Sequence, residues 1–299
     1  MRRTLALGVG LLGLAGMALP AYAADLGRPV YKAPVAAPLP FTWTGCYVGA
    51  NAGWIGTHDK FLLTPTGNYL NPAGALAPPN AAGTGLLVGD AINVTDAFTG
   101  NDSGFTGGGQ VGCNYQAGWF VFGAEADING TSQDTTFTRA FAPFPSVSPG
   151  FTIGSQTESV NQKLDFYSTV RGRAGVAFDR FYVYGTAGVV IADEKSATNV
   201  SFLPAGALPV FDTSVHVGSR STTRTAPVFG GGLEYAFTNN WTMKAEYLHF
   251  DLQSLVYNSP LISPAGVAPG YSWGTRVKES NDVVRLGVNY KFDWGTPLR

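Results

Sequence analysis

The chain has 299 residues, and its 19 basic and 20 acidic residues give a formal net charge of −1. This balance gives no indication of a basic surface for nucleic acid. Aromatic and charged residues each make up 13% of the chain, and glycine occurs 39 times. Beyond the N-terminal segment no apolar run reaches the length of a spanning helix, which excludes inner-membrane helices and favours an outer-membrane β-barrel over a soluble domain.

The first 23 residues have the features of a secretory signal peptide. Arg2 and Arg3 form a basic start, an apolar stretch follows, and Ala21-Tyr22-Ala23 matches the small-x-small pattern that precedes cleavage. We predict cleavage between Ala23 and Ala24. An uncleaved anchor helix is the alternative, but the apolar stretch is short for one. The predicted location is therefore the outer membrane of a Gram-negative bacterium.

Residues 24–42 contain four prolines spaced by small residues, which favours an extended polyproline II segment without a packed core. We interpret this segment as a periplasmic leader. A disordered tail without a role is the alternative.

Eight segments then alternate apolar residues with glycine or polar residues at every second position, as expected of β-strands. In chain order they are 44–55, 104–115, 120–129, 164–178, 181–191, 229–237, 241–247 and 284–292. Three pairs of segments are joined by short turns at Gln116-Ala117-Gly118, Asp179-Arg180 and Thr238-Asn239-Asn240. The other connections, near 56–102, 131–162, 193–222 and 252–278, are long, lack a sustained period and are predicted to be loops.

Short turns that alternate with long loops are typical of transmembrane β-barrels. The predicted fold is all-β: an eight-stranded antiparallel up-and-down transmembrane β-barrel over 43–292, with short periplasmic turns and four long extracellular loops. Residues 293–299 form a C-terminal tail. Aromatic residues concentrate beside the short turns and the C-terminus, where a membrane barrel has its periplasmic aromatic girdle: Trp119, Phe120, Phe178, Phe181, Phe237, Trp241, Tyr290 and Phe292.

The polar faces of the strands decide between a soluble barrel, which is apolar inside, and a membrane barrel, which is apolar outside. They carry five acidic and five basic residues: Glu125, Asp127, Asp165, Glu234 and Glu246 with Arg171, Arg173, Lys244, Arg285 and Lys291. Pointed inward, these ten can pair across a narrow lumen, which removes the cost of isolated buried charges. We therefore predict a membrane barrel with a lumen charge network.

Cys46 and Cys113 are the only cysteines, and each lies about three residues from the periplasmic end of its predicted strand, on the same face. Because the periplasm is oxidising, we predict a cross-strand disulfide, with two free cysteines facing lipid as the alternative. The histidines are His58, His216 and His249, and their spacing ties none of them to a catalytic serine or a paired acid. We predict no catalytic, metal or cofactor site.

The sequence resembles the alphaproteobacterial outer-membrane β-barrel family that includes the Omp25 and Omp31 surface proteins of Brucella, and related OmpA-like membrane domains. The resemblance rests on WTGCYVG (43–49), GGGQVGCNYQ (107–116), FGAEAD (122–127), VRGRAG (170–175), GGGLEY (230–235), KAEY (244–247) and RLGVNYKF (285–292). It implies an eight-stranded outer-membrane barrel with surface loops that serves envelope structure and contact with a host or the environment. Barrels of this family end on an aromatic residue that the assembly machinery reads; Phe292 matches that position, although this chain continues beyond it.

The predicted function is a non-enzymatic structural and surface-interaction protein with a charge-plugged lumen. A narrow porin-like channel for ions or small solutes is the alternative, and an outer-membrane enzyme acting at the rim is a third hypothesis. Predicted partners are outer-membrane lipid and lipopolysaccharide, the assembly machinery, and a host or environmental surface ligand bound by the long loops, with no nucleic acid. The predicted loops carry aromatic residues suited to binding, or alternatively to packing the loops together or extending the strands: Phe61, Tyr69, Phe141, Phe144, Phe151, Phe211, Tyr257, Tyr271 and Trp273.

Overall fold

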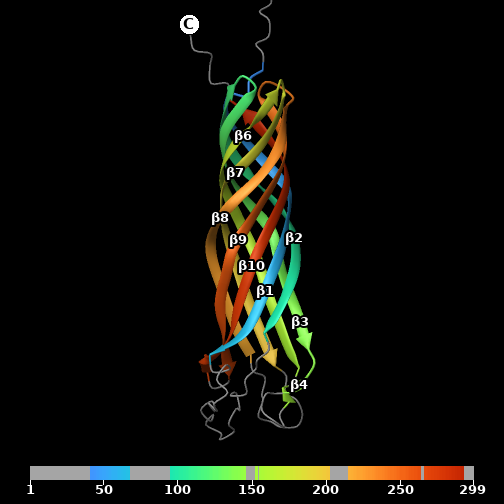
Figure 1. Cartoon of the computed structure of the whole chain (residues 1–299), viewed down its shortest axis with the longest axis vertical. Coiled ribbons are helices and arrows are strands. Elements are labelled where there is room, and N and C mark those ends of the chain that lie inside the picture. The colour runs from blue at the N-terminus through green and yellow to red at the C-terminus, as the bar shows by residue number, and fades with distance from the viewer. Residues whose placement is uncertain are drawn as a thin grey trace, which may run out of the picture. The chain divides into compact units, whose positions relative to one another are not determined.

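The computed structural model describes residues 41–67, 95–145, 152–153, 155–202, 215–263 and 266–292. Eight long strands form a closed barrel (Figure 1): β1 (Gly45–Gly67), β2 (Asp96–Ala117), β3 (Phe120–Phe141), β6 (Gln156–Phe178), β7 (Phe181–Phe202), β8 (Val215–Ala236), β9 (Trp241–Ser263) and β10 (Gly266–Lys291). Two short strands, β4 (Phe144–Pro145) and β5 (Thr152–Ile153), pair with each other. The predicted signal peptide, residues 24–40 of the leader and the tail after Phe292 lie outside the described residues.

The barrel closes because the first long strand pairs with the last. The order around the wall is β1-β10-β9-β8-β7-β6-β3-β2, and every neighbouring pair is antiparallel. Closure leaves no edge strand, so the backbone hydrogen bonds of the wall are satisfied within it. The predicted fold class is confirmed. None of the residues described here forms a helix long and apolar enough to cross a membrane.

The three short connections between strands lie at or within two residues of their predicted positions. The first is centred on Gly118 and Trp119, the second on Asp179 and Arg180, and the third spans residues 237–240. Gly118 (φ 64°) and Asp179 (φ 53°) adopt the left-handed conformation that glycine and aspartate tolerate in tight turns. All three turns lie at the same end of the barrel (Figure 1).

The strands are much longer than predicted, and the long-loop interpretation is wrong for much of the four connecting segments. Each barrel strand has between 22 and 26 residues, whereas about 9–11 suffice to cross a membrane. β1 continues to Gly67 and β7 to Phe202, well into the predicted loops. The sequence signal was weak there because polar residues interrupt both faces, so that inward apolar pairs such as Phe61 and Leu63 form only short runs.

Outward-facing side chains divide the barrel wall into two halves. Beside the short turns they are apolar and exposed, as with Val284 and Leu286 on β10, which are 60% and 63% exposed. Farther along β10 the outward positions are taken by Asp282, Ser280 and Lys278. An exposed apolar band next to a polar wall is the pattern of a barrel that crosses the membrane with one half and extends beyond it with the other. We call the second part the extended half.

The interior is filled by side chains in alternating layers. Three clusters of buried apolar residues follow one another along the barrel: the first contains Trp43 and Tyr182, the second Tyr167 and Phe250, and the third Phe61 together with Trp273, Leu255 and their neighbours. Two polar layers separate these clusters. Eight strands enclose a lumen just wide enough for side chains, which accounts for the dense filling.

Four of the aromatic residues predicted to lie in loops belong to this interior. Phe61, Tyr257, Tyr271 and Trp273 are between 0% and 7% exposed and form part of the outermost apolar cluster. For these four residues the alternative prediction, that the aromatic residues extend the strands, is correct, since they lie on β1, β9 and β10. Phe141 is half-buried on β3. Tyr69, Phe151, Phe211 and the side chain of Phe144 lie outside the described residues.

We expect Phe61→Ala to lower the free energy of unfolding by about 3–5 kcal/mol, the usual cost of a buried Phe-to-Ala change. The Phe61 ring stacks on Phe98 with centroids 4.7 Å apart, so its loss leaves a cavity in the extended half. Urea unfolding of the refolded barrel, followed by gel mobility, measures this. Val256→Ala is the control because Val256 is 51% exposed on the outer wall. Equal midpoints for the two variants would show that residue 61 is in a loop.

Candidate functional site

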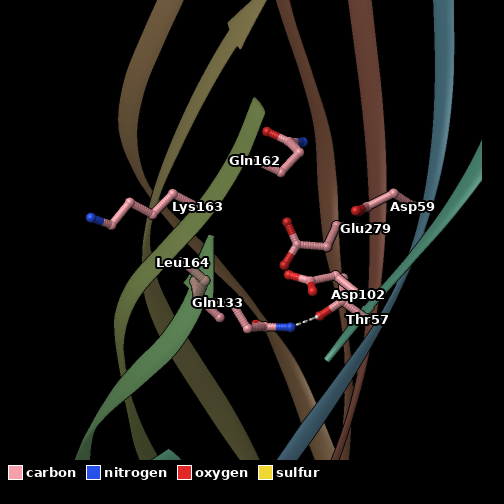
Figure 2. A pocket seen from close by; sticks show the side chains of 8 residues that line it. All are labelled: Thr57, Asp59, Asp102, Gln133, Gln162, Lys163, Leu164 and Glu279. Carbon is pink, nitrogen blue, oxygen red and sulfur yellow. Dashed lines mark hydrogen bonds between the residues drawn. The ribbon is translucent and has the colours of Figure 1, made fainter. Parts of the chain in front are cut away.

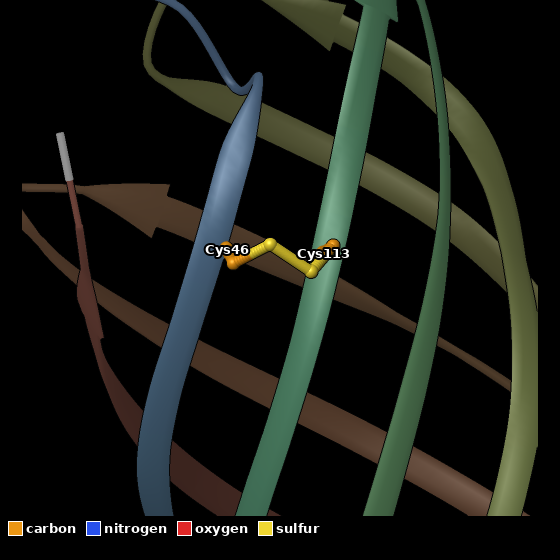
Figure 3. The surroundings of a disulfide bond; sticks show 2 residues. All are labelled: Cys46 and Cys113. Atoms are coloured by element: carbon orange, nitrogen blue, oxygen red, sulfur yellow. A yellow bond between two sulfur atoms is a disulfide. The ribbon is translucent and has the colours of Figure 1, made fainter. Parts of the chain in front are cut away.

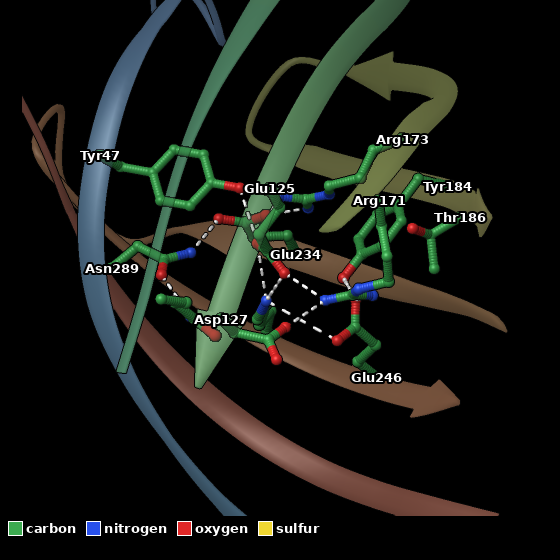
Figure 4. A network of polar contacts seen from close by, with 12 residues as sticks. Tyr47, Glu125, Asp127, Arg171, Arg173, Tyr184, Thr186, Glu234, Glu246 and Asn289 are labelled. Carbon is green, nitrogen blue, oxygen red and sulfur yellow. Dashed lines mark hydrogen bonds and ion pairs between the residues drawn. The ribbon is translucent and has the colours of Figure 1, made fainter. Parts of the chain in front are cut away.

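The inner polar layer lies within the membrane-spanning half and is centred on Arg171 (Figure 4). Its guanidinium contacts three carboxylates: Glu125 Oε1 at 2.6 Å, Asp127 Oδ2 at 2.9 Å and Glu246 Oε1 at 3.0 Å. β3 and β6 are neighbours in the wall, with Glu125 directly opposite Arg171, whereas β9 lies three strands from β6 and its Glu246 is reached across the lumen. Arg171 therefore joins its neighbouring strand to a distant part of the wall.

Three further cations complete the same layer. Arg285 Nη2 lies 2.8 Å from Asp127 and 2.6 Å from Glu246. Lys244 Nζ lies 2.7 Å from Glu125 Oε1. Arg173 contacts Glu125 at 3.1 Å and Glu234 at 2.6 Å.

The network is electrically balanced, with four acids and four bases, and seven of the eight side chains are fully shielded from solvent, Glu234 retaining 2% exposure. Burial of these charges is costly unless each one is paired and also hydrogen-bonded. Because each acid meets at least one base, and each of the four bases meets two or more acids, loss of one member leaves an uncompensated charge in the lumen.

Neutral side chains donate further hydrogen bonds to the carboxylates of the network. The Tyr47 hydroxyl donates to Glu125 Oε2 at 2.6 Å, and the Tyr184 hydroxyl donates to Glu246 Oε1 at 2.9 Å. Thr169 donates to Asp127, and Asn289 to Glu234. A Cβ at Gly232 would lie 2.8 Å from the Tyr184 hydroxyl, so glycine makes room for that ring.

These neutral partners were not among the predicted lumen residues, although the sequence carries a signal for them. Tyr47 and Tyr184 occupy the same alternate positions as the charged residues of their own or neighbouring strands. In a strand such positions face the same side of the sheet. An aromatic residue with a hydroxyl on a predicted lumen face is thus a candidate partner for a lumen carboxylate.

Two of the ten predicted lumen residues lie outside the inner network. Asp165 was predicted in the lumen, but it lies on the outer wall, where Lys195 Nζ is 2.5 Å and Lys163 Nζ 3.4 Å away. The reason is a register shift between Leu164 and Phe166, which breaks the alternation and turns Leu164 inward. Lys291 is buried at the short-turn end, where its Nζ donates to the Thr42 carbonyl and lies 4.5 Å from the centre of the Phe41 ring.

Cys46 and Cys113 form a disulfide between β1 and β2 (Figure 3). They are directly opposite in the strand register, and both side chains lie on the outer side of the wall. The pairing agrees with the prediction from their equal distances to the strand ends.

The outer polar layer lies in the extended half, outside the membrane-spanning segments (Figure 2). Asp59, Asp102 and Glu279 converge there on a small cavity that is also lined by Thr57, Gln133 and Gln162. Arg224 contacts Glu194 and approaches Glu279 to 3.5 Å, and Gln133 donates to Thr57 at 2.6 Å. This layer, unlike the inner one, has more acids than bases.

Burial is the main reason that the pKa of Asp59 rises to about 8, and the nearby carboxylates of Glu279 and Asp102 raise it further. Burial likewise raises the pKa of Glu279. The cavity therefore holds protons that ordinary carboxyl groups release at lower pH.

The three histidines do not share a site. His58 is exposed on the outer wall, and His216 is buried in the extended half. His249 Nδ1 lies 2.8 Å from Asp282 on the outer wall. Across residues 41–67, 95–145, 152–153, 155–202, 215–263 and 266–292, no three His, Cys, Asp or Glu side chains are grouped so that they could hold a metal ion.

We expect the free energy of unfolding to fall as pH rises from about 4 to about 8. Over this range the folded protein retains a proton on Asp59 that the unfolded chain, with a pKa near its ordinary value, has released. Asp59→Asn should reduce the number of protons released on unfolding by up to about one, so the free energy of unfolding should depend less on pH. Urea unfolding between pH 4.5 and 8.5 measures it. Asp134→Asn is the control, because that side chain is 53% exposed. An unchanged slope in Asp59→Asn would contradict the assignment.

Comparison with known proteins agrees with this architecture. The family model described as outer membrane protein beta-barrel domain matches residues 9–292. The 31 kDa outer-membrane immunogenic protein of Brucella melitensis is 33% identical over 290 residues, which cover 94% of this chain and 98% of that protein. The 22 kDa outer membrane protein of Rhizobium leguminosarum bv. viciae is 29% identical over 221 residues, which cover 72% and 82%.

Among solved structures, the outer membrane protease OmpT from Escherichia coli is similar over 85% of this chain and 99% of its own, with 11% identity and a TM-score of 0.41. The family match spans nearly the whole chain, including all eight barrel strands. The chain therefore belongs to the outer membrane protein β-barrel family and is an outer-membrane protein of a Gram-negative bacterium.

Proposed function

We propose that this protein is a non-enzymatic structural and surface-interaction protein of the outer membrane, with a lumen that is closed to solutes. The observation that carries the proposal is the inner charge network, in which Arg171 and its three carboxylate partners have no solvent-exposed side-chain surface. A relative is named as an immunogenic outer-membrane protein, which supports a surface-exposed role.

The layers on either side of the network support a closed lumen. Toward the short turns, Trp43 is 1% exposed and donates from its indole nitrogen to the Asp179 carbonyl at 3.1 Å. Toward the extended half, Tyr167 and Phe250 pack at a ring separation of 5.8 Å. An ion would have to displace both apolar layers and separate paired charges between them.

A narrow channel is the second candidate function. The inner layer presents charges from β3, β6, β8, β9 and β10, so a small rearrangement there would produce a polar path through the membrane-spanning half. The two candidates differ in whether the charge network breaks under physiological conditions.

We also propose that the extended half and the connections at its end face the cell exterior, while the short turns face the periplasm. Short periplasmic turns and longer outer connections are the usual arrangement in bacterial barrels. Function then resides at the outer end, where binding groups are carried on a rigid scaffold. In this orientation the 24–42 leader is periplasmic and follows a signal peptide cleaved between Ala23 and Ala24.

Phe292 is proposed as the residue recognised by the assembly machinery. It is 45% exposed at the periplasmic end of the wall, and its backbone N–H donates to the Cys46 carbonyl at 2.9 Å. Its ring thus remains outside the wall at the seam where β1 and β10 meet.

We expect little or no conductance from the purified protein in planar lipid bilayers. Arg171→Ala and Glu246→Ala should each produce intermittent currents, because the remaining partners repel one another or recruit water. Lys163→Ala is the control, since that lysine lies on the outer wall. Stable, large unitary currents from the unmodified protein would rule out the closed lumen and favour the channel.

An epitope inserted after Pro78 should be labelled on intact cells, whereas the same epitope at Asn239 should be labelled only after permeabilisation. Asn239 lies in the third short turn, where its side chain accepts a hydrogen bond from Arg180. Fluorescent antibody binding to cells measures both. The reverse labelling pattern would overturn the orientation and the function assigned to the outer end.

A further inference from the structure

Three cations lie together on the outer wall of the extended half, on the strands that close the barrel. Lys60 on β1 is directly opposite Lys278 on β10, and Arg276 is two residues farther along β10, opposite Leu62. All three cations are exposed. We call Lys60, Arg276 and Lys278 the seam patch.

Within the part of the chain that the structure describes, no carboxylate forms an ion pair with any member of the seam patch. The adjacent positions on the flanking strands are neutral: Thr99 is opposite Lys60, and Val256 is opposite Arg276. Like charges directly opposite each other in a sheet destabilise it. The seam patch is therefore an unfavourable arrangement for the isolated barrel.

A second pair of opposed lysines on the wall shows the contrast. Lys163 on β6 is directly opposite Lys195 on β7, but Asp165 lies between them and contacts both, at 3.4 and 2.5 Å. There the chain supplies its own anion. At the seam patch none of the described carboxylates does so, which leaves the patch available to an anion from outside the protein.

The position of the seam patch indicates which anionic molecules lie next to it. Before the facing lysines, the last exposed large apolar residues on these strands are Trp54 and Val284, each six residues away. At about 3.3 Å per residue and a strand tilt of about 40°, the patch lies roughly 15 Å beyond the hydrocarbon region. It points sideways from the wall, toward molecules in the same leaflet, rather than toward the end of the barrel.

We propose that the seam patch binds the phosphorylated, anionic saccharide region of a lipopolysaccharide molecule beside the barrel. Opposed residues lie about 5 Å apart and diagonal ones about 7–8 Å apart, so three cations can contact one or two phosphate groups. Lysine and arginine both form charge-assisted hydrogen bonds to phosphate, and arginine can do so through two N–H groups. This assignment rests on the proposed orientation of the extended half.

The test compares two variants of the full-length refolded protein in detergent micelles. In the seam variant Lys60, Arg276 and Lys278 are each changed to Gln, and in the matched control Lys163 and Lys195 are each changed to Gln. Binding of fluorescently labelled rough-type lipopolysaccharide is measured by fluorescence anisotropy. We expect the seam variant to bind at least tenfold more weakly and the control within about twofold of the unmodified protein, because three charge-assisted contacts are lost only in the former.

Two further measurements distinguish phosphate recognition from nonspecific adsorption and from misfolding of the seam variant. Enzymatic removal of phosphate from the lipopolysaccharide should weaken binding to the unmodified protein and leave the seam variant unaffected. Without lipopolysaccharide, the seam variant should unfold at a higher urea concentration than the unmodified protein, since the repulsion is relieved. That result also shows that the variant folds.

Equal affinity of the seam variant and the unmodified protein would overturn the proposal. So would binding that is insensitive to phosphate removal, or competition by inorganic phosphate or a sulfated polysaccharide with no preference for lipopolysaccharide. Because micelle binding does not depend on orientation in the cell, failure here leaves the epitope result intact. An inverted epitope pattern would instead refute the proposed function itself.

Discussion

The requirement that every backbone polar group be bonded within the wall underlies the rest of this structure. Lipid provides no hydrogen-bond partners, so a sheet that crosses it has to close, and here β1 closes on β10. Closure at eight strands leaves a lumen only wide enough for side chains. Any charge that points inward must therefore find its counter-charge inside, and Arg171 meets this condition by contact with Glu125 on the neighbouring strand and with Glu246 across the lumen.

The two polar layers differ because their surroundings differ. The inner layer lies within the membrane-spanning half and is balanced, with each acid paired to at least one base. The outer layer around Asp59 and Glu279 lies beyond the membrane, and burial there raises the pKa of both carboxyl groups. The inner layer is balanced by ion pairing, whereas in the outer layer burial favours the protonated form of two carboxyl groups.

The extended half continues the barrel wall beyond the membrane and gives its outer end a rigid support. Its interior aromatic cluster, with Phe61 stacked on Phe98, holds the strands together where no lipid surrounds them. Its outer wall carries charges that are paired at Asp165 and unpaired at the seam patch. In the proposed orientation, the seam patch faces molecules of the same leaflet and the end of the extended half faces the cell exterior.

The sequence by itself determined the eight strands, the three turns, the inward and outward faces of the membrane-spanning half and the cysteine pairing. Lipid demands apolar residues at alternate positions, so the period of two is readable without knowledge of neighbouring strands. Eight of the ten predicted lumen charges form the network for the same reason. The same alternation of inward and outward positions also identifies the neutral partners Tyr47 and Tyr184 as lumen-facing residues.

Only the tertiary structure decided the remaining features. The continuation of β1 to Gly67 depends on pairing with β2 and β10, which no local pattern of polar residues reveals. The outward position of Asp165 follows from a register shift against two neighbouring strands. The convergence of Asp59, Asp102 and Glu279, and the direct opposition of Lys60 and Lys278, arise from residues far apart in the chain that meet because the barrel closes.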